Sequence, residues 1–250
     1  RMWGNFFVTD NRAVSAADYD TLTITAPTHP RLNTSGQPVS YYLLKDSGFG
    51  QFDDYFTFES DYGDSTYYWQ GVDVTVNART ANGLTVQGGM SMGGGVRDTC
   101  EIEAALPELV GTQQISACRV EEKWLANYQG LITYRVPRVD VLVSGILRSQ
   151  ANFGPNGTPA SNGNSLAATY TVTNAQVLAA LGRPLAGNSQ NTNVDLTLPG
   201  QLYGDRIYNV DMRFAKILRY GGTRTNVGID LSNIFNANTP TAYNTAFGFS

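Results

Sequence analysis

The sequence predicts an all-β fold, built of antiparallel strands of the kind that form transmembrane β-barrels. Three observations predict it. Apolar and polar residues alternate along several segments, tight turns join these segments at one end, and stretches of tens of residues join them at the other end. Successive side chains of a strand point to opposite faces, so a barrel wall offers one apolar face to lipid and one polar face to water.

The first predicted hairpin extends from residue 71 to residue 92. In its first strand Val72, Val74 and Val76 share a face. The other face carries Asp73, Thr75 and Asn77. The turn Thr80-Ala81-Asn82-Gly83 contains the Asn-Gly pair that is typical of tight hairpins. After the turn the apolar residues of the second strand recur at every other position, namely Leu84, Val86, Met90 and Met92, with Gly88 between them.

Two further hairpins are predicted downstream. One pairs residues 127–135 with residues 139–148 through Pro137-Arg138. The other pairs residues 207–218 with residues 224–235 through Gly221-Gly222. Both show the same alternation of apolar and polar positions, so each is expected to have two faces of opposite character.

A soluble β-sandwich also alternates, and two features favour a barrel wall instead. Charged residues occupy the polar face, and a dry core could hold them only at a cost of several kcal/mol each unless they were paired, whereas a water-filled lumen accepts them. The expected lumen-facing residues are Asp73, Asp211, Arg213 and Asp230. Aromatic residues collect near the predicted strand ends, where an interfacial girdle would lie: Tyr67, Tyr68, Trp69, Trp124, Tyr128, Tyr134, Tyr208 and Tyr220.

Composition narrows the class of protein. The 250 residues include 26 glycines and only 15% charged residues, as expected for β structure with long polar loops. No run of about 18 apolar residues occurs, so a transmembrane helix is not predicted. The net charge of −4 and the lack of a basic stripe argue against binding of nucleic acid. The first residues lack the features of a signal peptide, which suggests a fragment or a processed piece.

The two cysteines, Cys100 and Cys118, are predicted to form a disulfide. Both lie in one irregular segment, with 17 residues between them. A reduced pair in a cytosolic protein is the alternative, but a loop that faces the cell exterior favours oxidation. A zinc site is not expected, because the single histidine, His29, is remote in sequence.

Three long segments are expected to be loops, at about residues 10–64, 98–122 and 152–205. They contain local helix signals, one at residues 101–106 after Thr99 and one at residues 174–181 between Thr173 and Gly182. In the first segment carboxylates lie among aromatic residues, which suits calcium or a stacked sugar, although a solvated acidic loop remains the alternative. The candidate ligand-binding residues there are Asp46, Asp53, Asp54 and Tyr55.

No catalytic constellation is predicted, and we expect neither an enzyme nor a cofactor. Residues 89–93 fit the Gly-x-Ser-x-Gly expression, but they lie along a predicted strand with no helix after it. Gly93-Gly94-Gly95 lacks the lysine and the helix of a phosphate-binding loop.

Several stretches resemble the C-terminal barrel of TonB-dependent outer-membrane receptors, in particular the Oar-like receptors with a carboxypeptidase-regulatory domain. They are residues 71–83, residues 182–187, Leu198-Pro199-Gly200 with Tyr203-Gly204-Asp205-Arg206, and above all residues 209–216 and 223–236, which are similar to the penultimate hairpin of that family. The resemblance covers nearly the whole chain. It implies a 22-stranded barrel, a plug domain, and import of a scarce nutrient such as a metal chelate or a glycan.

Compared with this family, the chain is expected to be the C-terminal third of a receptor, without the plug domain and the last strand. The resemblance implies that the tight turns face the periplasm and the long segments face the exterior. The implied partners are the energy-transducing protein TonB, outer-membrane lipid or lipopolysaccharide, and an unidentified small-molecule or glycan ligand. A non-transporting surface barrel or adhesin, and a secreted β-sandwich that binds carbohydrate, remain alternatives.

Overall fold

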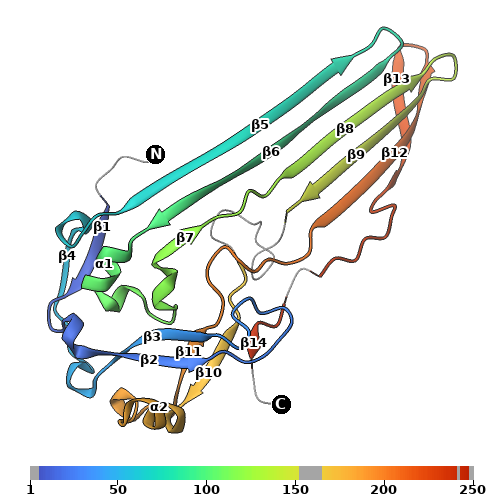
Figure 1. The fold of residues 1–250 in the computed structure, drawn as a ribbon. Helices are drawn as coiled ribbons and strands as arrows, with labels where there is room; N and C mark the ends of the chain where they lie inside the picture. Colours follow the sequence, from blue (N-terminus) through green and yellow to red (C-terminus); the bar gives the residue numbers. More distant parts are fainter. Residues whose placement is uncertain (1–5, 152–164, 241–242, 248–250) are drawn as a thin grey trace.

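The computed structural model describes residues 6–151, 165–240 and 243–247. The chain is mostly antiparallel β-sheet, as predicted (Figure 1). One large sheet of long strands, which we call the wall, extends from a set of short strands and helices, which we call the lobe. Within the described residues the wall is an open sheet that does not close into a barrel, and β5 and β13 form its two edges.

The wall consists of six long strands in which sequence neighbours pair antiparallel. The order is β13-β12-β9-β8-β6-β5, and the short strand β7 (Arg119–Glu121) also pairs with β6. The long strands are β5 (Thr66–Arg79), β6 (Leu84–Asp98), β8 (Asn127–Val136), β9 (Val141–Gln150), β12 (Ile207–Tyr220) and β13 (Thr223–Leu231).

All three predicted hairpins are present, with some shifted boundaries. Gly83 and Gly221 have positive φ in the β5–β6 and β12–β13 turns. The β8–β9 turn covers residues 137–140, longer than predicted, because Arg138 and Asp140 both adopt positive φ and Val139 therefore lies outside the strand. Strand β13 ends at Leu231 rather than at Phe235, because Asn233 turns into the left-handed region.

The sequence predicts that the long segments are loops. Most of their described part instead folds into the lobe. Its elements are two-stranded and three-stranded sheets with two α-helices and several 3₁₀ turns. Its strands are β1 (Phe7–Asn11), β2 (Tyr19–Thr25), β3 (Pro38–Leu44), β4 (Asp54–Phe58), β10 (Thr169–Thr173), β11 (Asn191–Asp195) and β14 (Ala246–Phe247), and its helices are α1 (Cys100–Ala105) and α2 (Asn174–Leu181). Residues 152–164 of the third segment lie outside the described residues.

The lobe has its own hydrophobic core. Residues from the first and third long segments, more than 120 positions apart, pack against one another there. Full burial of one large apolar side chain stabilises a fold by about 1.5–3 kcal/mol. The core residues are Leu22, Ala26, Leu32, Val39, Tyr41, Ala168, Val172, Val177, Leu185, Val194 and Leu196.

Helix α2 forms where its capping signals predicted it. The Thr173 side chain accepts a hydrogen bond from the Gln176 backbone N–H, and the Gln176 side chain in turn accepts one from the Thr173 backbone N–H. Gly182 ends the helix with φ of 70°, a conformation that glycine adopts without a steric penalty. The helix buries Val177 in the lobe core.

We expect Thr173→Ala to lower the free energy of unfolding of the lobe by about 1 kcal/mol, because one N-terminal amide loses its acceptor. Thermal unfolding followed by circular dichroism measures this. Thr171→Ala, an equal truncation on the preceding strand, should have a smaller effect, and equal effects of the two variants would contradict the capping role.

An ion pair joins the segment just after α2 to the β2–β3 sheet. The Arg183 Nε donates to Asp20 Oδ2 at 2.6 Å, and the same guanidinium donates to the Leu43 carbonyl at 3.1 Å. The Arg183 guanidinium holds the pKa of Asp20 below its ordinary value of 3.8, with a smaller contribution from Lys45.

This lowered pKa predicts a pH dependence. The pair contributes fully above pH about 3.8, and the contribution is lost as the pH falls through the lower folded-state pKa. Since the pair is partly exposed, we expect Arg183→Gln to cost less than about 1 kcal/mol at pH 7. The difference between the two proteins in unfolding free energy should shrink at strongly acidic pH, where the variant lacks only the bonds of the guanidinium to backbone carbonyls. A difference that stays constant down to pH 2 would contradict this assignment.

Candidate functional site

The strand register gives the wall two faces of opposite character. One, the apolar face, carries apolar residues on neighbouring strands at matched positions, as the pairs Val74 with Met90, Phe214 with Val143 and Phe214 with Ile229 show. The band continues across all six strands. Its further members include Val72, Val76, Val86, Met92, Ile132, Leu147, Val210, Met212, Val227 and Leu231.

The opposite, polar face carries the charged residues that the sequence predicted there. Asp73, Asp211, Arg213 and Asp230 all belong to it by register. Arg213 and Asp230 are directly opposed on β12 and β13, with the guanidinium 3.4 Å from the carboxylate. Asp211 accepts the backbone N–H of Asn233 at 2.8 Å, just after β13 ends. Asp73 shares this face but lies on β5, at the opposite edge of the sheet from β13, and pairs by register with Ser91. These four residues therefore do not form one cluster.

The register divides the aromatic residues that were predicted to form a girdle. Five tyrosines lie on the apolar face, three near the lobe and two near the tight turns: Tyr68, Tyr128, Tyr208, Tyr134 and Tyr220. Tyr67 and Trp69 lie on the polar face instead, because adjacent residues of a strand point in opposite directions. The Trp69 indole fills the space beside Gly71 and Gly93, where any added Cβ would come within 2.3 Å of its ring.

Much of the apolar face stays exposed, since no described element packs over its middle. Val74 is 45% exposed, Val76 52% and Ile229 67%. Monomeric soluble proteins rarely expose apolar patches of this extent, which mark sites of contact with lipid or with protein.

The predicted ligand residues of the first long segment do not converge on one site. The Asp46 side chain accepts the Gly187 backbone N–H at 2.9 Å, and the Tyr55 ring lies 3.3 Å from the Arg12 guanidinium carbon. Asp53 and Asp54 lie next to each other at the start of β4, where the Asp53 backbone N–H donates to the Asn11 side chain. Within residues 6–151, 165–240 and 243–247, no three His, Cys, Asp or Glu side chains are grouped to hold a metal ion. The ligand-binding role of these four residues stays a prediction.

The predicted disulfide is present. Cys100 and Cys118 are joined, with their Cα atoms 4.7 Å apart. The bond connects the start of α1 to the end of a 3₁₀ turn (Ile115–Cys118), and the Thr99 backbone N–H donates to the Cys118 carbonyl beside it. The segment between β6 and β7 is thus closed into a compact loop.

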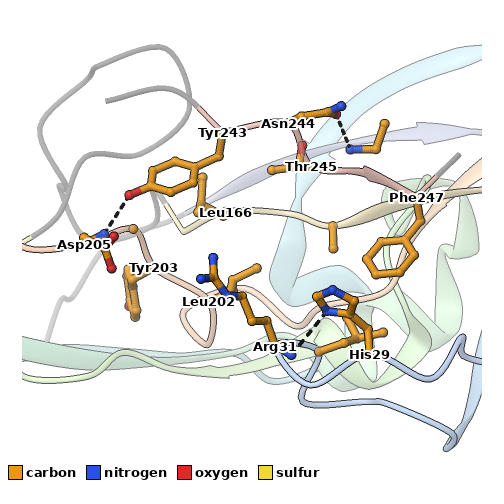
Figure 2. A pocket seen from close by; sticks show the side chains of 14 residues that line it. His29, Arg31, Leu166, Leu202, Tyr203, Asp205, Tyr243, Asn244, Thr245 and Phe247 are labelled. Carbon is orange, nitrogen blue, oxygen red and sulfur yellow. Dashed lines mark hydrogen bonds between the residues drawn. The ribbon is translucent and has the colours of Figure 1, made fainter. Parts of the chain in front are cut away.

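The structure also contains a cavity that the sequence did not predict. It has a volume of about 620 Å³ and lies in the lobe, next to the segment that leads into β12. Figure 2 shows how four separate segments surround it. The lining side chains that matter most are His29, Arg31, Leu32, Leu166, Leu202, Tyr203, Asp205, Tyr243 and Phe247. They come together only through the tertiary fold, so no local pattern could have indicated them.

The cavity combines an apolar floor with several polar side chains. Leu32 and Leu166 are buried, and the imidazole of His29 meets the Phe247 ring edge-on at 5.3 Å between centroids. Tyr243 Oη accepts the Asp205 backbone N–H at 2.8 Å. Burial raises the pKa of Tyr203, with a smaller effect of Glu122, so this phenol stays a neutral donor at physiological pH.

No helix in the described residues is both long and apolar enough to cross a membrane. Comparisons of the chain with protein-family models, with curated proteins and with solved structures found no match.

Proposed function

We propose that the chain is the C-terminal barrel portion of a TonB-dependent outer-membrane receptor that imports a scarce nutrient across the outer membrane. The observation that carries this proposal is the two-faced wall. Six neighbouring strands present an apolar band on one face and most of their charged residues on the other, with Lys216 on the apolar face near the tight turns, and tyrosines lie at both ends of the apolar band. Lipid on one side and water on the other account for this pattern.

A soluble sandwich would need a second sheet over the apolar face. Within the described chain nothing takes that place, and the lobe lies beyond the ends of the strands rather than over them (Figure 1). In lipid the free edges of β5 and β13 would leave backbone groups unpaired, which the bilayer does not tolerate. We therefore propose that further strands of a large barrel pair with both edges.

The orientation follows from the same proposal. The tight turns after β5, β8 and β12 lie in the periplasm, and the lobe with its disulfide lies outside the cell, where oxidation is favoured. The polar face lines the lumen, and the apolar face contacts outer-membrane lipid or lipopolysaccharide. TonB would act through the plug domain of the receptor, and the lobe would contact the imported small molecule or glycan.

Membrane fractionation of cells that express the full gene tests this proposal. We expect the protein in the outer-membrane fraction, resistant to extraction by alkaline carbonate and soluble only in detergent. Recovery of the protein in a detergent-free soluble fraction would contradict it and would favour the secreted carbohydrate-binding sandwich.

A further inference from the structure

The cavity of the lobe has a cationic group without a partner of its own. Figure 2 shows the Arg31 side chain reaching into the cavity from the β2–β3 connection. Among the described residues its guanidinium makes neither an ion pair nor a hydrogen bond, and only the Arg31 backbone N–H is engaged, with His29 Nδ1 at 3.2 Å. The five donors of a guanidinium favour a carboxylate or phosphate.

His29 supplies a second donor. Its Nδ1 accepts the Arg31 backbone N–H, so the proton of the neutral ring lies on Nε2. This N–H has no hydrogen-bond partner among the residues that the structure describes. The backbone turn that holds His29 is fixed by its own N–H, which donates to Ser35 Oγ at 2.9 Å.

The other side chains that line the cavity determine what kind of apolar group the ligand carries. Leucine side chains form the floor, and the rings of Tyr203, Tyr243 and Phe247 border it. Such a surface favours a flat apolar body over a sugar, whose hydroxyls would lose water without gaining partners on the leucines. The carboxylate of Asp205 also lines the cavity and disfavours an anion of more than one charge.

From these contacts we infer that the cavity binds an amphipathic monoanion, an organic carboxylate on a flat apolar ring system. Arg31 binds the carboxylate, His29 Nε2 donates a second hydrogen bond, and the aromatic rings with the leucine floor contact the apolar body. The inference deepens the proposed function, on which it rests in treating the lobe as the ligand-capturing side. The cavity lies directly before β12, so a bound ligand contacts the segment that joins the lobe to the wall.

Fluorescence anisotropy of 2-naphthoate with the detergent-solubilised protein tests this inference. We expect 2-naphthoate to bind, and its neutral analogue 2-naphthamide and the dianion 2-naphthyl phosphate to bind about tenfold more weakly or worse. Arg31→Gln should weaken binding of 2-naphthoate by about tenfold or more, as loss of a charge-assisted hydrogen bond does. Arg31→Lys should retain part of the affinity. Neither variant removes a hydrogen bond or an ion pair of the fold, since the Arg31 side chain makes none in the described part of the chain.

Arg12→Gln is the matched control, because Arg12 is an arginine of the same lobe whose guanidinium lies over Tyr55, outside the cavity. It should leave the affinity unchanged. Equal binding of 2-naphthoate and 2-naphthamide, an unaffected Arg31→Gln variant, or no binding of any probe would overturn the inference. These results are independent of membrane fractionation, so failure of the cavity assignment and failure of the transporter proposal can be distinguished.

Discussion

Replacement of Val74 by lysine is expected to destabilise the protein in a lipid bilayer by about 2–4 kcal/mol, the cost of a lysine on the lipid face near the bilayer midplane. Val74 lies in the middle of β5 on the apolar face, and its neighbour across the strand pair is Met90. The next residue, Thr75, points to the polar face. Thr75→Lys should therefore change the unfolding free energy by less than about 1 kcal/mol.

The two variants differ by one position and introduce the same charge into the same strand, so strand propensity cannot explain a difference between them. Urea unfolding in detergent–lipid vesicles, followed by tryptophan fluorescence, measures both free energies. Equal tolerance of the two lysines would mean that both faces of β5 contact water. That outcome would contradict a lipid-facing wall.

The second large effect concerns the disulfide. We expect the double variant Cys100→Ser with Cys118→Ser to lose about 3 kcal/mol in the stability of the segment between β6 and β7, because the unfolded chain regains the entropy of an open loop of this length. The wall should still form, since its ladders do not involve this segment except through β7.

Limited proteolysis and hydrogen exchange of residues 99–121 report this loss. Reductant should have the same effect on the native protein and no effect on the double variant, which makes the reduced native protein a control without any substitution. Unchanged protection after removal of both cysteines would show that α1 and the neighbouring turns hold this segment without the bond.

The hairpins of the wall could be predicted because their information is local. Alternation along each strand and a turn sequence such as Asn82-Gly83 specify both the register and the faces. The same holds for α2, which lies between Thr173 and Gly182 as its capping residues predicted. Errors arose next to residues in the left-handed region, which the sequence pattern did not reveal: β9 begins only after Asp140, and β13 ends before Asn233.

The lobe could not be predicted because its contacts are not local. Leu22 and Val194 belong to one core although they lie in different long segments, and neither segment alternates for long enough to indicate its partner. The acidic residues around Asp53 drew attention as a cluster in the sequence, yet in the fold the Asp46 side chain accepts the Gly187 backbone N–H, and Asp53 is held at the start of β4 by its backbone N–H. Arg31 and Tyr203 are far apart in the sequence, and only the tertiary fold places them around one cavity.

The most direct test of a lipid-facing wall is the accessibility of single spin labels at residues 72–77 of β5 in lipid vesicles. Each label is attached to an introduced cysteine, since the native pair is oxidised. We predict a period of two, with oxygen accessibility high at residues 72, 74 and 76 and accessibility to a water-soluble nickel complex high at residues 73, 75 and 77. Uniform access of the nickel complex to all six positions would show that neither face contacts lipid, and would contradict the proposed barrel.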